Sequence, residues 1–149
     1  MKSTLSLAQY VKKRNGVPLG ASGSMTNMLS RAFGAPSFWV FWQYWNPIWG
    51  YYLSRDIMRP LANFLPISLA TFTTFLFSGA LHDIAVSIIK WKIILFFTPW
   101  FGLMGLIVIF SKWAGISYGQ VRWPVRALTN ASFIFVSLGV TYFLETLYA

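Results

Sequence analysis

The sequence lacks cysteine altogether, and among its 149 residues it has one histidine and three acidic residues. Without cysteine, neither a disulfide framework nor a thiolate metal site can form. One histidine and three acids are also a poor basis for a zinc site with several protein ligands. We therefore expect no bound metal and no bound cofactor.

Charged residues are scarce as well. They make up 10% of the chain and hydrophobic residues 56%, whereas an average soluble domain has about a quarter charged residues. Four long runs contain no Lys, Arg, Asp or Glu apart from Asp83. They are residues 32–54, 64–89, 93–111 and 127–144. A helix needs roughly 20 apolar residues to cross the hydrocarbon core of a bilayer. The composition therefore predicts an all-α integral membrane protein.

The net charge of +9 would suggest nucleic-acid binding in a soluble chain. Here the basic residues flank the apolar runs, where Lys and Arg meet lipid head groups and set the orientation of membrane helices. We therefore expect these charges to serve the lipid bilayer, and we expect no nucleic-acid partner.

Two regions are predicted along the chain. In residues 1–31, the apolar residues of 3–14 recur near helical spacing and end in basic residues, which indicates a short interfacial helix. The Gly, Pro, Ser and Asn residues that follow indicate a loop. Residues 32–149 form a membrane domain, with a kink expected at Pro99 and helices expected at about 64–89, 93–111 and 127–147.

The aromatic-rich segment 32–59 is predicted to enter the membrane and return. Its core, FWQYWNPIWGYYLSRD, contains the helix-breaking pair Asn46-Pro47. If the segment spanned the membrane, the basic residues would divide seven against five between the two sides; if it returns, they divide ten against two, with a cytoplasmic N-terminus. The second division fits the positive-inside rule far better. Non-helical backbone at that depth requires protein or a wet cavity around it, so we expect one of these around Asn46.

The only histidine, His82, is expected inside the hydrocarbon core, roughly 9 Å from its centre at 1.5 Å per residue. Ser78, Phe75, Thr71 and Ser68 precede it at helical spacing and fall within a stripe about 80° wide. An ionisable group at such depth suggests function. His82 is therefore a candidate general base; the alternative is a histidine that only hydrogen-bonds a neighbouring helix. Gly79, beside the stripe, would let another backbone or a ligand approach closely.

Two further polar residues have open roles. Asp83 cannot face His82 from the adjacent helical position, and we expect it to be structural, either pairing with Lys90 or Lys92 or orienting a group on another face. Asn46 could position a substrate carbonyl or a water, but the local sequence favours capping of the turn that Pro47 creates.

Two segments together resemble the core of the membrane-bound O-acyltransferase family. They are SFWVFWQYWNPIWGYYLSRDIMRPL, residues 37–61, and TFTTFLFSGALHD, residues 71–83. In that family an aromatic-rich segment ends in His or Asn. A membrane helix further along the chain ends in three consecutive positions: a small residue, then Leu or Trp, then His. Asn46 and His82 fall at these two positions. The resemblance covers roughly residues 20–90.

The resemblance implies transfer of an acyl group from a thioester, usually acyl-CoA, to a hydroxyl or amine acceptor within the membrane. His82 would be the general base, and Asn46 would assist near the acyl carbonyl. The substrates would lie along Ser78, Thr71, Ser68 and Trp45. The implied location is a multi-pass position in a membrane, with the bacterial cytoplasmic membrane as the nearest match.

The sequence also departs from the family pattern. Tyr44 stands where the family usually has a basic residue, and family enzymes are normally several times longer. The chain is therefore expected to work in a homo-oligomer or with an additional membrane subunit, or to be a shortened relative. One alternative function is a non-catalytic membrane partner for packing or lipid binding. Another is a small transporter or channel subunit, which would need a second charge facing the stripe, and only Asp83 is available.

Overall fold

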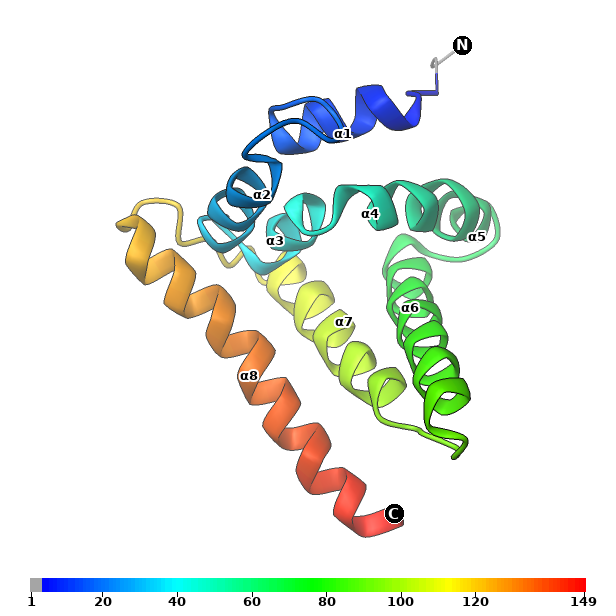
Figure 1. Cartoon of the computed structure of the whole chain (residues 1–149). Coiled ribbons are helices and arrows are strands. Elements are labelled where there is room, and N and C mark those ends of the chain that lie inside the picture. Colours follow the sequence, from blue (N-terminus) through cyan, green and yellow to red (C-terminus); the bar gives the residue numbers. More distant parts are fainter. Residues whose placement is uncertain (1–3) are drawn as a thin grey trace.

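The computed structural model describes residues 4–149, and every regular element in that range is helical, which confirms the all-α prediction for this part of the chain. Figure 1 shows the long helices side by side and the shorter helices gathered across one end of them. In chain order the elements are α1 (Leu7–Asn15), α2 (Ser24–Phe33), α3 (Phe38–Tyr44), α4 (Pro47–Leu53), the π-helical turn η1 (Ser54–Met58), α5 (Arg59–Ala62), α6 (Ile67–Lys90), α7 (Phe97–Trp113) and α8 (Trp123–Tyr148).

The predicted N-terminal helix is present as α1. A capping box starts it, because the Ser6 side chain accepts from the Gln9 backbone N–H and the Gln9 side chain accepts from the Ser6 backbone N–H. Gly16 ends it in the left-handed conformation, at φ 81°. The basic residues of its last turn complement the negative end of the helix dipole; they are Lys12, Lys13 and Arg14.

The loop predicted after α1 is too long, because its second half is helical. Only residues 16–23 connect the two helices, and α2 begins at Ser24 after the left-handed Gly23. Met28 and Ala32 lie one helical turn apart, and Ala32 is completely buried. The glycines and serines of 20–24 favour a loop locally, and the packing of the apolar face of α2 stabilises the helix beyond them.

The aromatic-rich segment is interrupted where the sequence predicts. The chain leaves α3 at Trp45, and Asn46 adopts a left-handed conformation with φ 42° before α4 starts at Pro47. The Asn46 side chain accepts from the Trp49 backbone N–H at 3.3 Å, so Asn46 caps α4, the structural role that the local sequence favours. α4, η1 and α5 then run across the end of the bundle to the start of α6 (Figure 1).

The three long helices match the predicted ranges to within a few residues. α6 follows Pro66 and ends at Lys90, and the next residue, Trp91, is left-handed with φ 51°. α8 begins earlier than predicted, at Trp123, because Pro124 suits the first turn of a helix. The kink predicted at Pro99 is wrong: Pro99 is the third residue of α7, where its missing N–H costs little.

Small residues bring α6 and α7 close together. A Cβ atom added to Gly79 would lie 2.6 Å from the carbonyl oxygen of Phe97, and one added to Gly105 would lie 3.0 Å from Phe75. The close approach expected at Gly79 is therefore confirmed, and the partner is the backbone of α7. The buried core lies beneath α3, where Phe38 and Phe41 are 0% and 1% exposed.

Polar groups connect the start of α8 to the segment between α2 and α3. The Asn130 side chain is fully buried and donates to the carbonyls of Phe33 and Ala35 at 2.9 and 3.1 Å. The Tyr118 hydroxyl donates to Asn130 Oδ1, and Arg126 donates to the Gly34 carbonyl at 2.7 Å. Burial raises the pKa of Tyr118 to about 12.

α6 and α8 are long and apolar enough to cross a membrane, with mean hydropathies of 1.5 and 1.6, and only 17% of each apolar window is buried. α7 is apolar but shorter, with 17 residues. In α8, Phe133 and Ile134 are the partly buried apolar residues that pack against the core. The residues that α8 buries fully are polar, namely Asn130, Ser137 and Thr141, whereas most of its large apolar side chains are exposed. A surface helix of a soluble protein has the opposite arrangement.

Candidate functional site

His82 lies on the face of α6 that meets α4 and α7. Its Nδ1 is 2.7 Å from the backbone carbonyl oxygen of Ser78, one turn earlier on the same helix. A carbonyl can only accept, so a neutral imidazole must carry its proton on Nδ1 to make this bond. The lone pair is then on Nε2, and this is the nitrogen that can take a proton.

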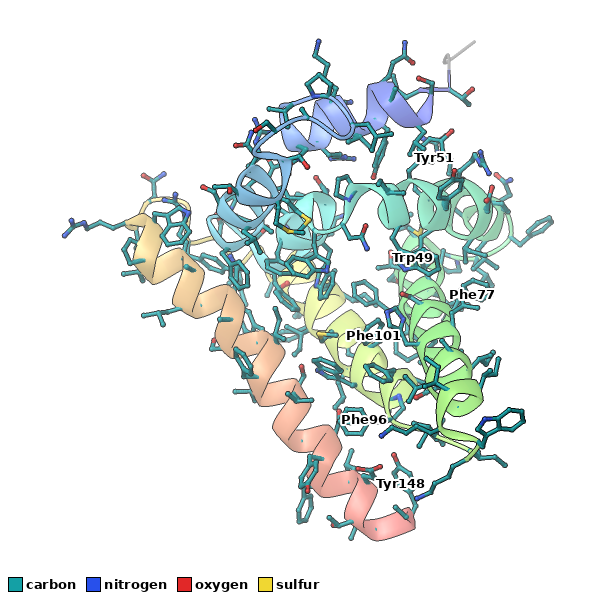
Figure 2. All side chains as sticks on the ribbon, in the orientation of Figure 1. Trp49, Tyr51, Phe77, Phe96, Phe101 and Tyr148 are labelled. Carbon is teal, nitrogen blue, oxygen red and sulfur yellow. The ribbon has the colours of Figure 1, made fainter. Side chains whose placement is uncertain are left out.

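Aromatic rings surround the imidazole of His82, which is half-buried. The ring centroids of Phe101, Phe97 and Trp49 lie 4.9, 5.6 and 6.4 Å from that of His82. Figure 2 shows Trp49 beside α6 below α4, and Phe101 between α7 and α6, whereas Phe77 points away from the site. Nε2 has no hydrogen-bond partner in the described part of the chain and is not fully buried. Apolar rings thus pack around the imidazole, and its basic nitrogen Nε2 makes no hydrogen bond within the described residues.

Hydrogen bonds connect Asn46 to this site by way of Trp49. Asn46 caps the first turn of α4, which contains Trp49, and the Trp49 indole N–H donates to Ser78 Oγ at 3.0 Å. Ser78 is 6% exposed, and its carbonyl is the one bonded to His82. The structure therefore brings together Asn46, Trp49, Ser78 and His82 as a connected series. Sequence reasoning gave Trp49 no role in the site, although its position three residues after a capping Asn is a usable signal.

The other predicted substrate-binding residues lie apart from this series. The Thr71 hydroxyl donates to the Ile67 carbonyl at 2.8 Å, a bond within its own helix. Ser68 is exposed near the start of α6. Trp45 packs in the core against Phe33 and Phe41, with ring centroids 6.3 and 5.7 Å apart.

Asp83 faces the start of α7. Its carboxylate accepts from the backbone N–H groups of Phe96, Phe97 and Thr98 and from the Thr98 hydroxyl, at 2.6–2.9 Å. The first pairing considered, with Lys90 or Lys92, is therefore wrong, and the second, orientation of a group on another face, is confirmed. The reason is that donors at the helix terminus of α7, brought close by Gly79, saturate the carboxylate.

The structure also has two apolar hollows, and neither is lined by His82. A groove of about 410 Å³ lies between α7 and α8. A second hollow of about 360 Å³ lies by the loop that joins α6 to α7. Within residues 4–149, no three His, Asp or Glu side chains come together in a way that could hold a metal ion.

Fold and site together define an all-helical protein with an accessible imidazole between two closely packed helices. Comparison with models of protein families, with curated proteins and with solved structures finds no match to this chain.

Proposed function

We propose that this protein is a membrane-embedded acyltransferase of the kind that the membrane-bound O-acyltransferase resemblance implies. His82 is the general base, acyl-CoA is the donor, and a hydroxyl or amine is the acceptor. The observation that supports this proposal best is the bond from His82 Nδ1 to the Ser78 carbonyl, because it leaves the Nε2 lone pair free for a proton.

In the proposed reaction, Nε2 of His82 takes the proton of the acceptor hydroxyl while its oxygen bonds to the thioester carbonyl carbon. The carbon–sulfur bond then breaks, and the CoA sulfur leaves with the proton that the imidazolium returns. Asn46 supports this chemistry by holding Trp49 in place, and its exposed side-chain NH2 group donates to no protein group in the described part of the chain. That NH2 group is free to donate to the acyl carbonyl, and we propose Ser68 and Thr71 as the approach to the base.

The proposed membrane location rests on the side chains of α8, which are mostly apolar on the outside and polar where they are buried. Its outward side chains include Leu128, Phe143 and Leu147, which are 71%, 64% and 70% exposed, while the residues that it buries are polar. Lipid tails are a suitable environment for such a surface. The proposed arrangement is multi-pass, in a bacterial cytoplasmic membrane.

The direction of the helices supports a proposed orientation. α6 leads away from the end that carries α1 to α5, α7 returns to it, and α8 leads away again (Figure 1). Among the described residues, every Lys and Arg lies at that end except Lys90 and Lys92, at the far end of α6. We therefore propose that the N-terminal end faces the cytoplasm, in line with the positive-inside rule.

A second function, that of a non-catalytic membrane partner, is favoured by the position of the two hollows described above. A small-molecule site buries most of its ligand, and neither of the two hollows described above is lined by His82. The missing walls would come from a second copy or from another membrane protein. The transporter alternative is weaker, because the carboxylate of Asp83 is saturated by the start of α7.

The absence of cysteine makes a direct assay possible, because free thiol can arise only from released CoA. The purified full chain in detergent is given acyl-CoA and a hydroxyl acceptor, and thiol release is followed. We expect His82→Ala to lower the rate by about 100-fold or more, the usual contribution of a general base. Trp91→Ala, at a position that is 93% exposed, is the control and should retain the rate. Equal rates of wild type and His82→Ala would rule out the catalytic role, and an inactive wild type with a copurifying membrane protein would favour the partner function.

A further inference from the structure

The carboxylate of Asp83 replaces a missing helix cap on α7. Phe96, the residue before α7, supplies no side-chain cap. Instead, Asp83 Oδ1 accepts from the N–H groups of Phe96 and Phe97 at 2.9 and 2.8 Å, and Oδ2 accepts from the N–H and the hydroxyl of Thr98 at 2.8 and 2.6 Å. Asp83 is only 4% exposed. These bonds satisfy donors at the helix start that would otherwise have no partner, so they fix the first turn of α7 against α6.

Phe97 belongs to this fixed turn and also contacts the imidazole. Its backbone N–H is bonded to Asp83, and its ring centroid lies 5.6 Å from that of His82. On its other side, the Phe97 carbonyl lies where a side chain on Gly79 would be. The backbone of Phe97 is therefore held from two sides, and the place of its ring beside His82 follows from that.

The ring of His82 keeps one orientation only if its neighbours prevent it from turning. The second side-chain torsion of histidine is broad and does not select one orientation by itself. Packing against Phe97 and Phe101 limits this torsion and keeps Nδ1 at 2.7 Å from the Ser78 carbonyl. If the Phe97 ring moved away, the imidazole could rotate and the proton could pass to Nε2.

We propose that Asp83 is a positioning residue for His82. By holding the first turn of α7, it keeps Phe97 against the imidazole and so maintains the tautomer in which Nε2 is unprotonated. This inference rests on the proposed function, in which Nε2 is the base. Asp83 acts through Phe97, because adjacent positions on a helix point in different directions.

The chain offers a direct test because His82 is its only histidine. The full chain, labelled with 15N-histidine and placed in lipid nanodiscs, gives the NMR shifts of a single imidazole. In alkaline buffer, where imidazole is neutral, the wild type should show the pure tautomer with the proton on Nδ1. Asp83→Asn replaces one acceptor oxygen with an NH2 group, which cannot accept from the α7 donors, and should give shifts averaged between the two tautomers.

Three more variants make the test specific. Asp56→Asn removes the same charge from an exposed residue paired with Arg55 and should leave the pure tautomer. Thr98→Val removes only the hydroxyl bond and should also leave it. Phe97→Leu retains every bond to Asp83 but removes the aromatic wall, so it should give the averaged shifts. It tests the contact through which Asp83 acts, and it gives a result even if Asp83→Asn does not fold. A pure Nδ1–H tautomer in either Phe97→Leu or folded Asp83→Asn would overturn the proposal.

The NMR measurement needs no substrate, so it separates this inference from the proposed function. If wild type does not release CoA but Asp83→Asn alters the tautomer, the proposed function fails and the positioning role holds. If wild type is active, Asp83→Asn should lower the rate at least about 10-fold, and Asp56→Asn should not. Full activity and an unchanged tautomer in Asp83→Asn would overturn the positioning role and leave the proposed function intact.

Discussion

Trp49 and Ser78 are joined across 29 residues of sequence by a hydrogen bond of 3.0 Å from the indole N–H to the serine hydroxyl. This bond connects the interrupted aromatic segment to the middle of α6. It places the Trp49 ring edge-on to His82, with 6.4 Å between the ring centroids. The turn at Asn46 and the imidazole are therefore parts of one structural unit.

Trp49→Phe should weaken this connection while it keeps an aromatic ring in place. The substitution leaves the buried Ser78 hydroxyl without its indole donor, and we expect a loss of about 0.6–1.5 kcal/mol in the free energy of unfolding. The measurement is thermal unfolding in detergent. Trp91→Phe, at a position that is 93% exposed, is the matched control and should have no effect. Equal stability of the two variants would show that the Trp49 bond contributes nothing.

Substitutions of Asn46 should separate capping from chemistry. Asn46→Ala loses the cap and places a side chain without local hydrogen bonding at φ 42°, so we expect a loss of about 1–2 kcal/mol. Asn46→Gly also loses the cap but suits the left-handed backbone, so its cost should be a few tenths of a kcal/mol.

The acyl-transfer assay then assigns the role of the Asn46 side chain. If Asn46 assists at the acyl carbonyl, Asn46→Gly should be stable but slow. If Asn46 only caps α4, Asn46→Gly should transfer acyl groups at nearly the wild-type rate.

Gly79→Ala should force α6 and α7 apart. The added Cβ would lie 2.6 Å from the Phe97 carbonyl oxygen and 2.8 Å from Thr98 Cα, both backbone atoms that cannot rotate away. We expect a loss of about 1–3 kcal/mol, as for other overpacked sites. Gly139→Ala, on α8 with nothing within 4 Å of the added atom, should instead gain up to about 1 kcal/mol from helix propensity. Both values come from thermal unfolding in detergent, and equal effects of the two substitutions would contradict the close approach at Gly79.

The proposed orientation can be tested with single cysteines in a chain that has none of its own. Ser117→Cys lies between α7 and α8 and Lys92→Cys between α6 and α7, at opposite ends of the long helices. In intact cells, a membrane-impermeant thiol reagent should label Lys92→Cys and should label Ser117→Cys only after lysis. Labelling of both in intact cells, or of neither, would contradict the arrangement.

The long helices and the break at Asn46 could be predicted because their signals are local. Apolar runs give the approximate ranges of α6, α7 and α8, and an Asn-Pro pair cannot continue a helix. α2 was missed because glycines and serines surround its start, and the packing that buries Ala32 is made with other helices.

The candidate site could be predicted only in part. Residue type and position indicated His82, Ser78 and Asn46, and the resemblance added a role for Asn46 near the acyl carbonyl. The roles of Trp49 and Phe97 depend on contacts between separate helices. Likewise, the donors that Asp83 meets are backbone groups, and no sequence pattern reveals which helix start will come close to a given carboxylate.

Within the proposed membrane arrangement, the shortness of α7 has a consequence for the supply of water to the imidazole. With 17 residues, α7 is about 26 Å long, whereas the hydrocarbon layer of a bilayer is about 30 Å thick. A bilayer accommodates such a hydrophobic mismatch partly by local thinning. In the proposed membrane arrangement, where the first turn of α7 packs against His82, thinning would draw the hydrated head groups of the far leaflet toward the proposed base. Protons would then have a short route to and from it.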